Sequence, residues 1–133
     1  MRLWHQALIP YLPRQQLLGQ HRECCALRGK GWGKKHSVVD YVFKHNPAKL
    51  VVYHYIIMEE MERRGYHPDR TWDNPDWRGN ILNEQVDWAD RKEVDQLWMN
   101  INQIGQIIYP EHNEAYLNEC LDNLKSKGIE IIL

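Results

Sequence analysis

One stretch near the start of the chain, QQLLGQHRECC at residues 15–25, decides the fold that we expect. Its apolar residues recur at helical spacing, and Pro13, just before it, suits the first turn of a helix. The stretch therefore predicts an amphipathic helix from Pro13 to Leu27, packed at the centre of the fold. Its inner face is expected to contain Leu17, Leu18, Cys24, Cys25 and Leu27.

Two charged neighbours in this helix, Arg22 and Glu23, need separate explanations. Adjacent residues on a helix point about 100° apart, so the two side chains do not face each other. A self-contained ion pair is therefore a poor account of them. Each is expected to have a partner elsewhere in the protein or in a ligand.

Helical signals also dominate the rest of the chain. Asn46-Pro47 provides a cap and a first-turn residue for a long helix that stops at Gly65, and Gly128 closes a last helix, Glu111–Lys127. The other expected helices are Val38–Lys44 and residues 90–105. No internal repeat is visible. The sequence thus predicts an all-α, compact single-domain fold over residues 1–133.

The segment from Tyr66 to Trp88 is rich in Pro, Asp, Asn and Trp. We expect an ordered loop there, because tryptophans in a small domain favour burial. The side chains expected to pin this loop to the core are Trp72, Trp77 and Trp88. An apolar tail, Ile129–Leu133, follows the last helix.

The composition is that of an ordinary globular protein, with 43% hydrophobic and 26% charged residues among 133. No apolar run approaches the length of a membrane span, and the opening residues lack an apolar segment of the signal-peptide type. Three cysteines, two of them adjacent, make a poor disulfide framework. We therefore expect a protein of the reducing cytoplasm.

The net charge of −1 conceals an asymmetry between the two halves of the chain. Residues 1–50 contain nine Lys and Arg against two acidic residues, a balance of +7, and residues 51–133 have a balance of −8. Such a division suggests a basic face for a polyanion. The alternative is that the two halves neutralise each other across the fold.

The loop Gly29–Lys35 concentrates part of this positive charge. It lacks the G-x-x-x-x-G-K-[ST] spacing of a nucleotide phosphate loop. It could still bring Lys30, Lys34 and Lys35 to a nucleic-acid backbone, with Trp32 available to stack on a base or wedge beside one. The alternative is an exposed loop whose tryptophan folds back onto the core.

Histidines and cysteines of the first helix raise the question of a metal site. His21, Cys24 and Cys25 could form one with His5, His36 or His54, since a helix brings residues three and four apart onto one face. No C-x-x-C pair or H-E-x-x-H motif is present, and adjacent cysteines are typical of core packing. We therefore expect no metal and no other cofactor.

The first residues, Met1-Arg2-Leu3, offer a nucleophile. A terminal α-amine has a reference pKa of about 7.7–8.0, so roughly a tenth to a fifth of it is neutral at pH 7. Arg2 and Arg22 nearby would lower that pKa and raise the neutral fraction. An α-amine, a carboxylate and arginines are together the parts of an imine-forming site.

These residues resemble a known family. The run Q-Q-L-L-G-Q-H-R-E at 15–23 is similar to the first helix of the phage-type pyrimidine-dimer DNA glycosylases, the endonuclease V of ultraviolet-damage repair. Further similarities lie in the opening Met1-Arg2-Leu3, in Arg63-Arg64-Gly65-Tyr66, in Trp77-Arg78-Gly79 and in Tyr109-Pro110-Glu111-His112. Residues 81–108 look like an insertion or a rebuilt segment.

The resemblance implies an all-α fold in which the Arg-Glu helix meets the chain's own N-terminus. It further implies that the amine of Met1 attacks the deoxyribose of a damaged nucleotide, displaces the base and forms an imine, after which β-elimination nicks the strand. Glu23 would steady the cationic sugar and transfer protons, and Arg22 and Arg2 would hold flanking phosphates. The expected partner is double-stranded DNA with pyrimidine dimers or abasic sites.

Two other functions are compatible with the sequence. One is a non-catalytic module that binds nucleic acid or protein through the same fold and basic face. The other is an enzyme that acts on a different small substrate in the same pocket. The position of the Met1 amine relative to the Glu23 carboxylate distinguishes an enzyme from the binding module.

Overall fold

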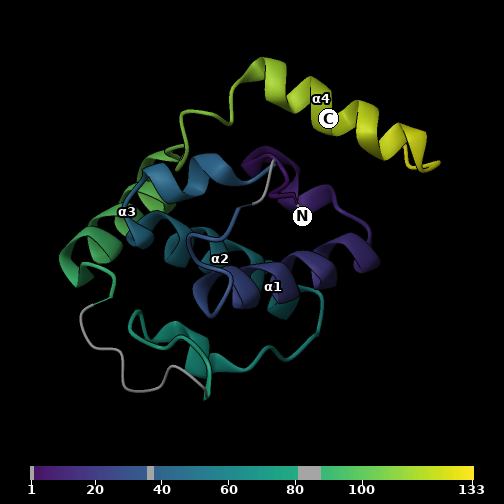
Figure 1. The fold of residues 1–133 in the computed structure, drawn as a ribbon. Helices are drawn as coiled ribbons and strands as arrows, with labels where there is room; N and C mark the ends of the chain where they lie inside the picture. The colour runs from purple at the N-terminus through teal and green to yellow at the C-terminus, as the bar shows by residue number, and fades with distance from the viewer. Residues whose placement is uncertain (1, 36–37, 81–87) are drawn as a thin grey trace.

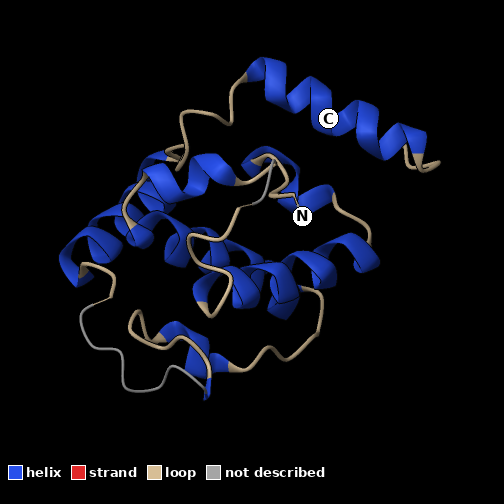
Figure 2. Ribbon diagram, in the orientation of Figure 1, coloured by secondary structure: helices blue, strands red, loops and turns tan. Residues whose placement is uncertain are grey.

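The computed structural model describes residues 2–35, 38–80 and 88–133 (Figure 1). Within these residues every regular element is a helix: four α-helices and three short 3-10 helices (Figure 2). The predicted all-α class is therefore confirmed. The described part of the chain contains no helix long and apolar enough to cross a membrane.

Helix α1 runs from Arg14 to Arg28, one residue later than predicted at each end. It ends where the backbone N–H of Gly29 bonds back to the carbonyls of Cys25 and Ala26. Leu17, Cys24 and Leu27 are fully buried. Leu18 and Cys25 are only partly buried, so their predicted burial was wrong: each follows a core residue and points about 100° away from it.

Helix α2, Pro47–Arg63, forms the centre of the packing. As predicted, the Asn46 side chain caps its N-terminus by accepting from Ala48 N–H at 2.9 Å, and Gly65 follows its end at φ 89°. Helix α2 packs against α1, α3 and the 3-10 helices η1 (Gln6–Tyr11) and η2 (Asp40–Lys44). Its burial is correspondingly broad, and the fully buried side chains include Leu50, Val51, Val52, Tyr53, His54, Ile57 and Met58.

The remaining elements follow the predicted order with changed bounds. Helix α3, Arg91–Ile104, matches the predicted helix at 90–105. Helix α4, Glu114–Ser126, begins later than predicted because the Asn113 side chain caps it by accepting from Tyr116 N–H. The predicted helix Val38–Lys44 is reduced to η2, and a further 3-10 helix, η3, spans Arg70–Asp73. The tryptophans of the 66–88 loop, Trp72, Trp77 and Trp88, are half-buried rather than buried.

The first residues of the chain lie between α4 on one side and α1 with α2 on the other (Figure 1). The Tyr53 hydroxyl of α2 donates to the carbonyl of Trp4 at 2.6 Å, and the Tyr116 hydroxyl of α4 donates to the carbonyl of Leu3 at 2.6 Å. Leu3 and Trp4 are themselves core residues. The chain start is therefore fixed by backbone contacts on both sides, and this fixes what lies next to α1.

Candidate active site

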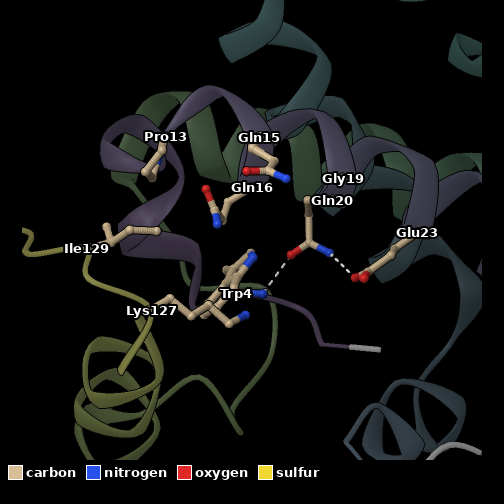
Figure 3. Close-up of a pocket in the computed structure, with 9 residues that line it drawn as sticks. All are labelled: Trp4, Pro13, Gln15, Gln16, Gly19, Gln20, Glu23, Lys127 and Ile129. Carbon is tan, nitrogen blue, oxygen red and sulfur yellow. Dashed lines mark hydrogen bonds between the residues drawn. The ribbon is translucent and has the colours of Figure 1, made fainter. Parts of the chain in front are cut away.

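Glu23 of α1 is half-buried and faces the first residues of the chain. Its Oε2 atom accepts from the backbone N–H of Arg2 at 3.4 Å and from the side-chain amide of Gln20 at 2.9 Å. Gln20 lies one helical turn before Glu23, so the two side chains share a face of α1 (Figure 3). The carboxylate predicted to meet the chain start is thus next to it.

The electrostatic surroundings of Glu23 favour proton transfer. Burial raises its pKa above the ordinary value of a glutamate, because the ionised form loses hydration. The hydrogen bonds from Arg2 and Gln20, together with the positive charge of Lys127, lower the pKa but do not cancel the effect of burial. A carboxyl group with a raised pKa can give and take a proton closer to neutral pH.

An open pocket of about 700 Å³ adjoins this carboxylate. Its wall combines the chain start, one face of α1 and the residues after α4 (Figure 3). The lining residues are Trp4, Pro13, Gln15, Gln16, Gly19, Gln20, Glu23, Lys127 and Ile129. The Lys127 ammonium lies over the Trp4 ring, 5.4 Å from its centroid. A residue near the C-terminal end of the sequence therefore forms part of the pocket wall.

Two predicted site residues lie at the first positions of the chain. Met1 lies outside the described residues. Arg2 contributes its backbone N–H to Glu23, but its guanidinium lies 5.7 Å from the Trp4 ring centroid and 3.6 Å from Glu119 of α4. The side chain predicted to hold a phosphate is therefore paired with a carboxylate of the protein.

The other predicted cations are on the surface. Arg22 is exposed on α1 and borders a second open pocket, of about 400 Å³, together with Arg14, Gln15 and Leu18. Lys30, Lys34 and Lys35 are also exposed. All four can reach a ligand in solvent.

The Trp32 side chain folds back onto the core and is not free to stack on a base, which is the second of the two possibilities considered from the sequence. Its ring contacts Phe43 and Trp88 edge to face, with centroids 5.0 and 5.2 Å apart. The side chain is partly buried against the core. We therefore leave Trp32 out of the interface proposed below.

Arg28 shows that the charge count overstates the basic face. Its side chain is fully buried and donates to the carbonyls of Trp72 and Asn74 at 2.7 and 3.0 Å. It also donates to Nδ1 of His54 at 2.9 Å. Burial lowers the pKa of Arg28 to about 10, which still leaves it charged at pH 7. This cation holds the 72–74 segment onto α1 and does not face a ligand.

The structure brings together one of the possible metal clusters, His21, Cys25 and His54, whose ligand atoms lie within 4.8 Å of one another. The hydrogen bonds argue for a different role. Because Arg28 donates to His54 Nδ1, the proton of neutral His54 is on Nε2, which donates to His21 Nδ1 at 2.8 Å. A metal-bound histidine normally donates its other N–H to an acceptor instead.

The cysteines and the other histidines that could have bound a metal also argue against a metal site. Burial raises the pKa of Cys25 to about 11, so the thiolate that metals prefer is disfavoured. Cys24 is a core residue, and His5 stacks on His112 in a separate cluster. His36 lies outside the described residues. We interpret Arg28, His54 and His21 as a hydrogen-bonded chain, buried at Arg28 and His54 and partly exposed at His21, that joins α1 to α2.

Two residues of the site, Gln20 and Lys127, were not predicted from the sequence as site residues. Gln20 bonds Glu23 and the chain start, and its place one turn before Glu23 is the signal that could have indicated it. Lys127 reaches the pocket from more than a hundred residues away. No local pattern could indicate that approach.

The all-α fold, in which the Arg-Glu helix presents its carboxylate to the chain's first residues beside an open pocket, agrees with the arrangement that the family resemblance implies. The model of the family described as pyrimidine dimer DNA glycosylase matches residues 1–74, more than half of the chain, and the protein belongs to this family. The match covers α1 and α2, with Gln20 and Glu23, but not Lys127. Neither the curated proteins nor the solved structures contain a match to the chain.

Proposed function

We propose that the protein is a DNA glycosylase with abasic-site lyase activity, which uses the α-amine of Met1 as its nucleophile. The observation that carries the proposal is the hydrogen bond from Arg2 N–H to Glu23, since it fixes the carboxylate one residue away from that amine. The substrate would be duplex DNA with a pyrimidine dimer or an abasic site, in keeping with the family. Residues 1–133 would act as a single domain.

The proposed reaction has two stages. In the first, the neutral amine attacks C1′ of the damaged nucleotide, and the bond from C1′ to the base breaks, so that the base leaves with the electron pair and takes up a proton. Transfer of a proton from the attached amine to the ring oxygen O4′, with breakage of the C1′–O4′ bond, then gives an imine. In the second, a base removes a proton from C2′ and the C3′–O bond breaks, which expels the phosphate and nicks the strand. Glu23, with its raised pKa, would transfer these protons.

The pocket beside Glu23 gives this chemistry room. Enzymes that act on a nucleotide within duplex DNA must turn it out of the stack. At about 700 Å³ the pocket is within the usual range for a small-molecule site. The amides of Gln15 and Gln16 could bond the polar edge of an extruded base.

Exposed cations would hold the DNA backbone. We assign phosphate contacts to Arg22, Lys30, Lys34 and Lys35, which are exposed in the structure. Arg2 has a different role in this proposal, because its guanidinium is paired with Glu119 and its backbone serves Glu23.

A strand-nicking assay tests the proposal. Three duplexes are compared: one with a cyclobutane pyrimidine dimer, one with an abasic site and one undamaged. The proposal predicts nicks at both lesions and none in the undamaged duplex. Nicking of the abasic-site duplex alone would mean that the protein has lyase activity but no glycosylase activity. Salt-sensitive binding without any nicking would favour the non-catalytic binding module.

A further inference from the structure

The side chain of Gln20 is almost fully buried, at 1% exposure, and both its amide oxygen and its amide nitrogen are hydrogen-bonded. Its Oε1 accepts from the backbone N–H of Trp4 at 2.7 Å, and the Tyr53 hydroxyl, whose one proton goes to the carbonyl of Trp4, lies 3.0 Å from the same oxygen. Its Nε2 donates to the backbone carbonyl of Arg2 at 2.8 Å and to Glu23 Oε2 at 2.9 Å. A side-chain amide has two donor positions, and here both are occupied.

These three bonds connect two parts of the proposed machinery. Two of them hold the backbone on either side of Leu3, through Arg2 and Trp4, and the third holds the Glu23 carboxylate. Figure 3 shows the bonds to Trp4 and Glu23. A side-chain amide suits this set, because its oxygen accepts from an N–H while its two N–H groups donate to a carbonyl and to a carboxylate.

Tyr53 reinforces the arrangement from α2. Its hydroxyl, which is fully buried, lies 2.6 Å from the carbonyl of Trp4 as well as 3.0 Å from Gln20. The chain start, α1 and α2 are thereby joined at one point. A buried polar network in which every member is satisfied is rigid, since each alternative arrangement leaves a polar group unpaired.

We propose that Gln20 is the positioning residue of the active site, which sets the chain start and the Glu23 carboxylate in one fixed relation. The inference rests on the proposed function, because it assigns the amine that precedes Arg2 as the nucleophile. Effective attack requires the reacting groups to be held in place, and a misplacement of about 1 Å can reduce a rate by about a hundredfold. Gln20 acts through the groups that it holds.

The substitution Gln20→Glu tests this role, because it keeps the size and shape but replaces the NH₂ donor by an oxygen. Above the pKa of the introduced carboxyl group, two carboxylates would face each other and would share a proton or separate. At lower pH a proton on the introduced carboxyl group restores one donor. The account therefore predicts a variant whose rate of imine formation is at least tenfold lower at pH 8 and whose pH optimum moves to lower pH.

The experiment measures borohydride trapping of the protein on an abasic-site duplex from pH 5 to pH 9, with the dissociation constant of the same duplex measured in parallel. The inference predicts an affinity within about threefold of wild type, together with the displaced pH profile. Gln103→Glu makes the same chemical change on the exposed surface of α3 and serves as the matched control. It should behave as wild type.

Tyr53→Phe is the second variant, for use if Gln20→Glu does not fold. It removes one hydroxyl while the ring still fills the core, and it should lower the trapping rate several-fold without moving the pH optimum. Folded variants that react at the wild-type rate at every pH would overturn the positioning role. So would an affinity reduced as much as the rate with an unchanged pH profile. If wild type itself forms no adduct, the proposed function falls and the inference falls with it.

Discussion

Glu23 accepts a hydrogen bond from the backbone N–H of Arg2, a residue 21 positions earlier in the chain. This contact places the carboxylate of α1 beside the first peptide groups of the protein. A second bond, from Gln20 to the same oxygen, fixes its direction. Both donors remain usable when the acceptor becomes a neutral amide oxygen, and this allows the charge of Glu23 to be tested without removing its contacts.

Glu23→Gln is therefore predicted to keep the fold and the DNA affinity while strand scission falls by at least about a hundredfold, the loss expected for a general acid–base group. Because the neutral α-amine attacks, the wild-type rate should fall as that amine is protonated on acidification, and Glu23, whose pKa is raised by burial, should add a second fall at lower pH. Single-turnover rates across pH check both statements. A Glu23→Gln variant that retains the second fall would assign it to another group.

His112 makes the stability of the protein sensitive to acid. Its Nδ1 accepts from the backbone N–H of Gln6, and burial lowers its pKa to about 3. The folded state therefore stays unprotonated while the unfolded chain binds a proton below about pH 6.5, so stability falls as the pH drops. From pH 7 to pH 5 His112 alone should remove about 2 kcal/mol.

The substitution His112→Gln should shrink the difference in unfolding free energy between pH 7 and pH 5 by about that amount. Denaturant unfolding at the two pH values measures it. His67→Gln, at an exposed position, is the control and should leave the difference as in wild type. Equal differences in both variants would contradict the assignment to His112.

Arg28→Lys should destabilise the fold although it preserves the charge. The guanidinium bonds two backbone carbonyls and His54 from a fully buried position. A lysine cannot reproduce this planar fork, and an acceptor left unpaired in the interior costs about 1–3 kcal/mol. We expect a loss of about 2 kcal/mol in urea unfolding. Arg22→Lys, exposed on the same helix, should change stability by less than about 0.5 kcal/mol.

DNA affinity should depend on salt through four exposed cations. With Arg22, Lys30, Lys34 and Lys35 at phosphates, log affinity is expected to fall with log salt at a slope of about −3 to −4. Each change to Ala should make the slope shallower by about one unit. Lys92→Ala, on α3, should leave the slope unchanged. A salt-independent affinity would rule out a phosphate-led mode of binding.

Local signals in the sequence predicted the positions and bounds of the helices well. The bounds of α2 follow from Asn46-Pro47 at its start and Gly65 after its end, which act through the backbone of their own turn. The spacing of Arg22 and Glu23 showed that they do not pair with each other, and the family resemblance implied that Glu23 meets the chain start, as it does. Such signals need no knowledge of tertiary contacts, so they could be interpreted without a structure.

The parts of the site that depend on distant contacts were not predictable in this way. Lys127 reaches the Trp4 ring only because α4 packs over the chain start, and Glu119 on the same helix pairs with Arg2. Arg28 counts as a surface cation in the sequence but is buried in the structure. The charge balance of the first half therefore overestimates the basic surface, since composition does not say which charges face solvent.

The most direct test of the central claim is borohydride trapping on an abasic-site duplex with the α-amine of Met1 free or acetylated. The account predicts a covalent protein–DNA adduct with the free amine, mapped by peptide mass to Met1, and none after acetylation of that amine alone. An adduct that persists after acetylation would contradict the account and assign the nucleophile to a lysine such as Lys30, Lys34 or Lys127. The absence of any adduct with the free amine would contradict the imine mechanism itself.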